Sequence, residues 1–196
     1  MIELDMQALI VSTGVVALAE VGDKTQLLAF ILAARFKKPL PIILGILCAT
    51  LVNHSLAGAV GAWLMSQISP DTMRWILGTS FIAMAAWTLI PDKLEEEEAQ
   101  IAKRWGVFGA TAITFFLAEM GDKTQLATVA LAARFADPVV VVMGTTLGML
   151  LADVPAVFVG NQFANKIPMG VVHAAAATIF AIIGILTLFK VDQFFR

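Results

Sequence analysis

The sequence predicts an all-α membrane protein with six transmembrane helices, arranged as two inverted three-helix repeats. Hydrophobic residues make up 59% of its 196 residues and charged residues only 14%, whereas a soluble domain is nearer half apolar and a quarter charged. The second half of the chain also repeats the first at a spacing of 99 residues. The formal net charge of −2 gives no indication of a nucleic-acid partner.

Six apolar runs are long enough to cross a bilayer, which takes about 20 residues. We expect the first run to be retained as a span, because the N-terminus is acidic and lacks the basic region of a signal peptide. The single Cys48 allows no internal disulfide. The predicted spans are 6–34, 39–66, 72–90, 105–133, 138–163 and 168–190.

The internal repeat sets the predicted organisation. A shift of 99 residues places Gly45 on Gly144 and holds its register without a gap over some forty residues. Each repeat has three predicted spans, an odd number, so the second repeat must enter the membrane in the opposite sense. Inverted repeats of this kind are typical of secondary transporters, whose sites lie near the bilayer midplane. The predicted parts are the first repeat at 1–91, an acidic linker at 92–104 and the second repeat at 105–196.

Lys and Arg in the loops predict the orientation, because cytoplasmic loops carry the excess of these residues. Seven fall on one side and four on the other, which favours a cytoplasmic central loop with both termini outside. One side holds Arg35, Lys37, Lys38, Lys93, Lys103, Arg104 and Lys166, and the other holds Arg74, Arg134, Lys190 and Arg196.

The most informative motif occurs twice inside apolar runs. Residues 20–27 read Glu-Val-Gly-Asp-Lys-Thr-Gln-Leu, and residues 119–126 read Glu-Met-Gly-Asp-Lys-Thr-Gln-Leu. Each ionisable residue at a helix centre costs about 2.5–3.5 kcal/mol in lipid, so these six must face each other or water. Ionisable residues at such a depth indicate a functional site. They are Glu20, Asp23, Lys24, Glu119, Asp122 and Lys123.

The local conformation at the motif has two alternatives. In a regular helix, the spacing i, i+3, i+4 places the Glu, Asp and Lys of each copy on one face and turns Thr and Gln away. The glycine beside each aspartate also allows the helix to unwind. Unwinding would bring backbone carbonyls and four further side chains toward the site, namely Thr25, Gln26, Thr124 and Gln125.

The charges predict the chemistry of the shared site. Four carboxylates and two ammonium groups sum to −2, so one divalent cation or two protons would neutralise the cluster. Metal and protons then compete for the same charge, as in a cation/proton antiporter. Oxygen ligands suit Ca²⁺, Mn²⁺ or Mg²⁺ better than soft metals. Lys24 and Lys123 balance charge or tune the carboxylates, and neither is expected to be a ligand. The structural alternative is that Asp–Lys and Glu–Lys pairs of the motif only hold two helices together.

Three more polar residues lie inside predicted spans, Asn53, His54 and Asp153. The 99-residue shift places His54 opposite Asp153. Local helix-to-helix hydrogen bonding is one interpretation, and a proton relay or an outer cation site is the other.

The doubled motif in a six-span chain resembles the Gdt-type cation/proton exchanger family, which includes Golgi manganese/calcium transporters and small bacterial manganese exporters. The resemblance covers the whole chain, and both copies fit the motif. It implies that Glu20, Asp23, Glu119 and Asp122 bind the cation, with Thr25 and Thr124 beside them. It further implies export of Mn²⁺, or of Ca²⁺, in exchange for protons.

We therefore expect a non-enzymatic secondary transporter in the bacterial cytoplasmic membrane. It would have no resident cofactor, and its partners would be a divalent metal, protons and the lipid bilayer, with a homodimer left open. Alternatives from other classes are a cation channel without proton coupling, an intramembrane metalloenzyme and an exporter of organic amines. The metalloenzyme is disfavoured because the sequence lacks the His ligands and the Ser or Cys nucleophile common in such enzymes.

Overall fold

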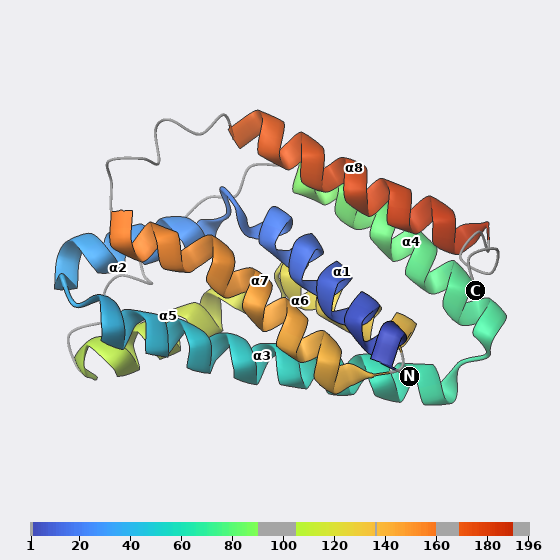
Figure 1. Cartoon of the computed structure of the whole chain (residues 1–196), viewed down its shortest axis with the longest axis horizontal. Coiled ribbons are helices and arrows are strands. Elements are labelled where there is room, and N and C mark those ends of the chain that lie inside the picture. The colour runs from blue at the N-terminus through green and yellow to red at the C-terminus, as the bar shows by residue number, and fades with distance from the viewer. Residues whose placement is uncertain (1, 90–104, 136, 160–168, 190–196) are drawn as a thin grey trace.

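The computed structural model describes residues 2–89, 105–135, 137–159 and 169–189, and all regular structure in these ranges is α-helical. The helices form one bundle (Figure 1). Their bounds are α1 Ile2–Glu20, α2 Lys24–Phe36, α3 Pro39–Gln67, α4 Pro70–Thr88, α5 Gly106–Glu119, α6 Lys123–Phe135, α7 Pro138–Val159 and α8 Met169–Leu188.

The predicted spans correspond closely to these helices, with one difference. The first and fourth predicted spans are each divided into two helices, α1 with α2 and α5 with α6, by short breaks at 21–23 and 120–122. The sequence had left open whether the helix unwinds there, and it does. By length and composition alone, α3 and α7 are the helices of the described ranges that are apolar and long enough to cross a membrane. The predicted linker, 92–104, lies outside the described residues.

Local sequence explains where several helices begin. Pro39 and Pro70 occupy the first turns of α3 and α4, where proline lacks only an N–H that has no helical partner. The Ser69 side chain accepts a hydrogen bond from the Thr72 N–H and caps α4. Asp137 Oδ1 accepts from Val139 and Val140 at the start of α7.

The two halves pack reciprocally at their long helices. α1 lies along α7 and α5 lies along α3, so each first helix packs against the long helix of the other half (Figure 1). Glycine makes both contacts close. A Cβ at Gly45 would lie 2.7 Å from the Thr111 Cβ, and a Cβ at Gly144 would lie 2.8 Å from the Ser12 Cβ. Gly45 and Thr111 are 99 residues away from Gly144 and Ser12, respectively, so the two contacts are equivalent.

The helices α4 and α8 form a pair at one side of the bundle (Figure 1), and each contacts the other far more than it contacts any other helix. Phe81 stacks on Phe180 with 6.3 Å between ring centroids, and these two residues are again 99 apart. The two helices of this pair have different further neighbours, because α4 contacts α6 whereas α8 contacts α1.

Candidate functional site

The site is built on the two helix breaks, which have the same backbone geometry. Gly22 has φ 84° and Gly121 has φ 80°, a region that glycine enters without steric cost. The Asp23 N–H donates to the Glu20 carbonyl over 3.0 Å, and the Asp122 N–H donates to the Glu119 carbonyl over 3.1 Å. The motif glycine is therefore what allows the chain to turn between its glutamate and its aspartate.

The motif glutamines stabilise the breaks from within. Gln26 Oε1 accepts from the Gly22 N–H at 2.9 Å, and Gln125 Oε1 accepts from the Gly121 N–H at 2.7 Å. Gln26 Nε2 also donates to the Ala152 carbonyl of α7. Both glutamines were candidate secondary ligands, and in this conformation their carbonyl oxygens hold backbone N–H groups instead.

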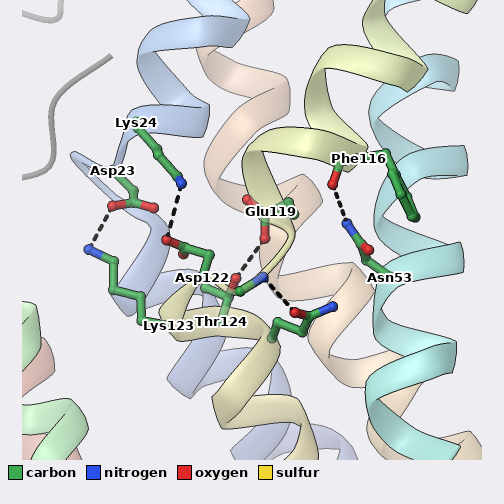
Figure 2. Close-up of polar contacts among 10 residues, drawn as sticks. Asp23, Lys24, Asn53, Phe116, Glu119, Asp122, Lys123 and Thr124 are labelled. Atoms are coloured by element: carbon green, nitrogen blue, oxygen red, sulfur yellow. Dashed lines mark hydrogen bonds and ion pairs between the residues drawn. The ribbon is translucent and has the colours of Figure 1, made fainter. Parts of the chain in front are cut away.

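The aspartates and lysines pair across the two halves. Lys123 Nζ lies 2.6 Å from Asp23 Oδ1, and Lys24 Nζ lies 3.6 Å from Asp122 Oδ1 (Figure 2). Asp23 stands at the N-cap position of α2, yet its side chain makes no capping hydrogen bond. Each break therefore supplies the counter-ion of the other, which is a reciprocal exchange like that of a two-fold interface.

The two pairs differ in burial. The side chains of Asp23 and Lys123 are both fully buried, whereas Lys24 is 23% exposed beside a nearly buried Asp122. Met120 and Gly121, at the second break, are exposed. The Lys24–Asp122 pair is thus the one that reaches the molecular surface.

The glutamates are fully buried and stand at the last positions of α1 and α5. Glu119 Oε2 accepts from the Thr124 hydroxyl at 2.7 Å (Figure 2). Glu20 has no hydrogen-bond partner for either oxygen among the described residues, and the Thr25 hydroxyl has none there either. Glu20 is close enough to Glu119 and Asp153 to interact with both electrostatically. Buried carboxylate oxygens without donors are what a cation or a proton can satisfy.

The remaining polar candidates surround the glutamates. Asn53 Nδ2 donates to the Phe116 carbonyl at 3.0 Å, which ties α3 to α5 one turn before Glu119 (Figure 2). His54 and Asp153 are fully buried, and no hydrogen bond joins them or satisfies either side chain within the described part of the chain. The helix-to-helix interpretation therefore fits Asn53 but not His54 or Asp153.

No three Asp, Glu, His or Cys side chains of the described residues converge closely enough to hold a metal ion. Two of the four predicted acidic ligands, Asp23 and Asp122, are engaged by lysines instead. A cavity of about 260 Å³ lies between α3, α4 and α6, but apart from Ser80 its walls are apolar, and they contain none of the predicted site residues.

Asp–Lys pairs that hold two helices together were one interpretation of the motif, but the sequence did not predict that each lysine pairs with the aspartate of the opposite half. The signal was present in the inverted repeat, because two facing copies of Asp-Lys can pair head to tail.

Ionisable side chains buried between apolar helices are typical of membrane proteins that move ions, and an integral membrane ion transporter is the class that this fold and site define. The sequence profile of the family described as "Divalent cation/proton antiporter GDT1" matches residues 8–96 and 107–193. The chain belongs to this family, whose members are transporters rather than enzymes.

Individual relatives agree with the family. A protein of Vibrio cholerae serotype O1 named "Putative manganese exporter" is 50% identical over 185 residues, covering 94% of this chain and 92% of that protein. GDT1-like protein 5 of Arabidopsis thaliana is 28% identical, covering 93% and 96% of the two chains. GDT1-like protein sll0615 of Synechocystis is 27% identical, covering 88% and 92%. No solved structure matches the chain.

Proposed function

We propose that this protein exports a divalent cation, Mn²⁺ before Ca²⁺, in exchange for protons. The substrate site consists of Glu20, Asp23, Glu119 and Asp122, and the protein needs no resident cofactor. The observation that carries the proposal is the burial of four acids and Lys123, with the partly exposed Lys24, at two helix breaks that exchange their counter-ions.

The proposed architecture is six spans in two inverted repeats. The count of six follows if each broken helix crosses the bilayer as one unit. Three sets of reciprocal contacts support the two-fold relation: Gly45 with α5 and Gly144 with α1, Phe81 with Phe180, and the two crossed ion pairs. Broken helices at the meeting point of inverted repeats are a recurrent way to build a midplane ion site.

Charge balance links the metal to protons. The four acids and two lysines sum to −2, and buried uncompensated charge is costly in a medium of low dielectric constant. A divalent cation neutralises the cluster, and two protons on the carboxylates do the same. A protein that can switch its site from one side of the membrane to the other only when the cluster is neutral would therefore exchange one divalent cation for two protons.

The direction of transport follows from the proton gradient. In a bacterial cytoplasmic membrane, with the termini outside and the central loop in the cytoplasm, the proton gradient protonates the acids from outside. Metal is then released there, and the proton gradient drives export.

Flux measurements in proteoliposomes test the function. Under an imposed pH gradient we expect uptake of Mn²⁺, less of Ca²⁺ and least of Mg²⁺, each with proton counterflow. Glu20→Gln, Glu119→Gln and Asp122→Asn should each reduce Mn²⁺ flux by about 10- to 100-fold or more, because loss of even an outer partner of a metal ligand costs that much and each change removes a proposed ligand charge. The matched control is Asp71→Asn, a change at an exposed acid in the first turn of α4, which should leave flux unchanged.

Two outcomes would contradict the proposal. Mn²⁺ flux that ignores the pH gradient would indicate a channel. Full activity of folded Glu119→Gln protein would remove the shared site.

A further inference from the structure

The two lysines of the doubled motif hold the carboxylates to which a cation would have to bind. Lys123 Nζ is 2.6 Å from Asp23, and Lys24 Nζ is 3.6 Å from Asp122. Each lysine comes from the opposite half, so neither pair is a by-product of adjacency in the sequence. Each ammonium group thus neutralises part of the negative charge of the site, one from each half of the chain.

An ammonium ion and a divalent cation compete for the same oxygens. Mn²⁺ and Ca²⁺ take carboxylate oxygens as direct ligands, and the positive charge of an ammonium group beside the same carboxylate repels a divalent cation. In the described residues, three acids do not converge on one point. Release of the aspartates from their lysines is what would let four acids share one ion.

We propose that the ammonium groups of Lys24 and Lys123 pair with the aspartates of the opposite half when no metal is bound. The transported cation then displaces these ammonium groups from the aspartates. The inference rests on the proposed function and adds a role for residues that would otherwise only balance charge. The lysines stay charged throughout, so the total charge of the cluster with metal bound remains zero.

The unequal pairs set the order of displacement. The Lys24–Asp122 pair is longer and reaches the surface, whereas the Lys123–Asp23 pair is short and closed. In this conformation the cation therefore enters by displacing Lys24, and Lys123 keeps the opposite side closed. In the two-fold-related conformation the two lysines exchange these roles.

Chemical labelling of lysine amines tests the displacement directly. The purified full-length protein is treated with a lysine-acylating reagent at fixed pH, with and without saturating Mn²⁺, and modification is quantified peptide by peptide. We expect Mn²⁺ to increase the modification of Lys24 about fivefold or more, the lower range of coupling between linked binding events. Lys37 and Lys38, which are exposed on the same segment of chain, are internal controls and should not change.

Two variants separate displacement from a general loosening of the protein. Asp122→Asn should increase the labelling of Lys24 without Mn²⁺ and abolish the response to it. Asp23→Asn removes the partner of Lys123 instead, so it should leave the labelling of Lys24 low.

The outcomes discriminate between the inference and the proposed function. If Mn²⁺ binds in the same sample but the labelling of Lys24 is unchanged or lower, displacement is wrong and the transport function stands. If Mn²⁺ does not bind to the folded protein, both are wrong.

A second readout uses the lysines themselves. Lys24→Arg keeps a cation that can pair with Asp122 and should retain exchange. Lys24→Gln removes the competitor, so it should bind Mn²⁺ more tightly while exchanging it more slowly. A purely structural lysine would instead lose binding and exchange together in Lys24→Gln, and that result would overturn the inference.

Discussion

The first and second helix breaks share six of their seven residues from Glu to Gln, and they differ in how they hold their charges. Asp23 lies in a short, closed pair with Lys123, whereas Asp122 faces a longer pair with the partly exposed Lys24. Glu119 has a hydroxyl donor in Thr124, whereas the equivalent Glu20 has none among the described residues. Two nearly identical sequences in unequal states indicate that the surroundings of each break contribute to its state.

The surroundings that differ are α4 and α8. α4 contacts α6, which follows the second break, whereas α8 contacts α1, which precedes the first. Strict two-fold symmetry would instead give α4 and α8 equivalent partners. The difference between the breaks therefore accompanies an asymmetric seating of this helix pair on the bundle.

The largest expected difference between the two breaks is in stability. Asp23→Asn leaves the fully buried Lys123 without its carboxylate and should lower the free energy of unfolding by about 3–5 kcal/mol. Asp122→Asn leaves Lys24 able to reach solvent and should cost about 0–1 kcal/mol. Thermal unfolding of the two variants in the same detergent measures this. Equal losses would show that the pairs are energetically alike.

A smaller difference is expected at the motif threonines. Thr124→Val removes the hydrogen bond to Glu119 and should raise the Mn²⁺ concentration for half-maximal flux about tenfold, since hydrogen bonds to charged groups contribute about 1.5–3 kcal/mol. Thr25→Val removes a hydroxyl with no partner in the described residues, so its effect should be weaker. The comparison fails if Thr25→Val is the more damaging change.

The smallest difference between the two breaks is expected at the motif glycines. Gly22 and Gly121 both have positive φ, so Gly22→Ala and Gly121→Ala should each destabilise the fold by about 1–2 kcal/mol. The control is Gly14→Ala inside α1, where a Cβ meets no atom within 4 Å and alanine should add about 0.5–1 kcal/mol of stability. Denaturation midpoints measure all three. A large difference between the two break variants would mean that the asymmetry extends into the backbone.

Much of the fold was predictable because lipid imposes simple rules on sequence. The apolar runs predict spans from 39 and from 138, where the structure begins α3 and α7. The repeat at 99 residues predicts equivalent elements, and Gly45 and Gly144 do make equivalent contacts.

The sequence predicted which residues form the candidate site but not which contacts they make with one another. Whether the helix continues through Gly22 depends on the φ angle of this residue. Glycine adopts positive and negative φ with similar ease, so the sequence does not decide it. The hydrogen bond from the Gly22 N–H to Gln26 forms only because the helix breaks there. Since the sequence left the break undecided, this bond was not predicted, and Gln26 was predicted to be a secondary ligand. The pairing of Lys123 with Asp23 is a tertiary contact across 100 residues, and local spacing carries no information about it.

The reciprocal glycine contacts have a consequence for how this chain can vary over generations. At Gly45 and Gly144 any larger residue would act as a wedge between the halves, because a first carbon already overlaps Thr111 or Ser12. In a library of all single substitutions, selected by growth at a toxic metal concentration, variants at Gly45 and Gly144 should therefore be depleted to a similar extent. An organism could tolerate drift on the lipid-facing surface while this pair of sites stays fixed.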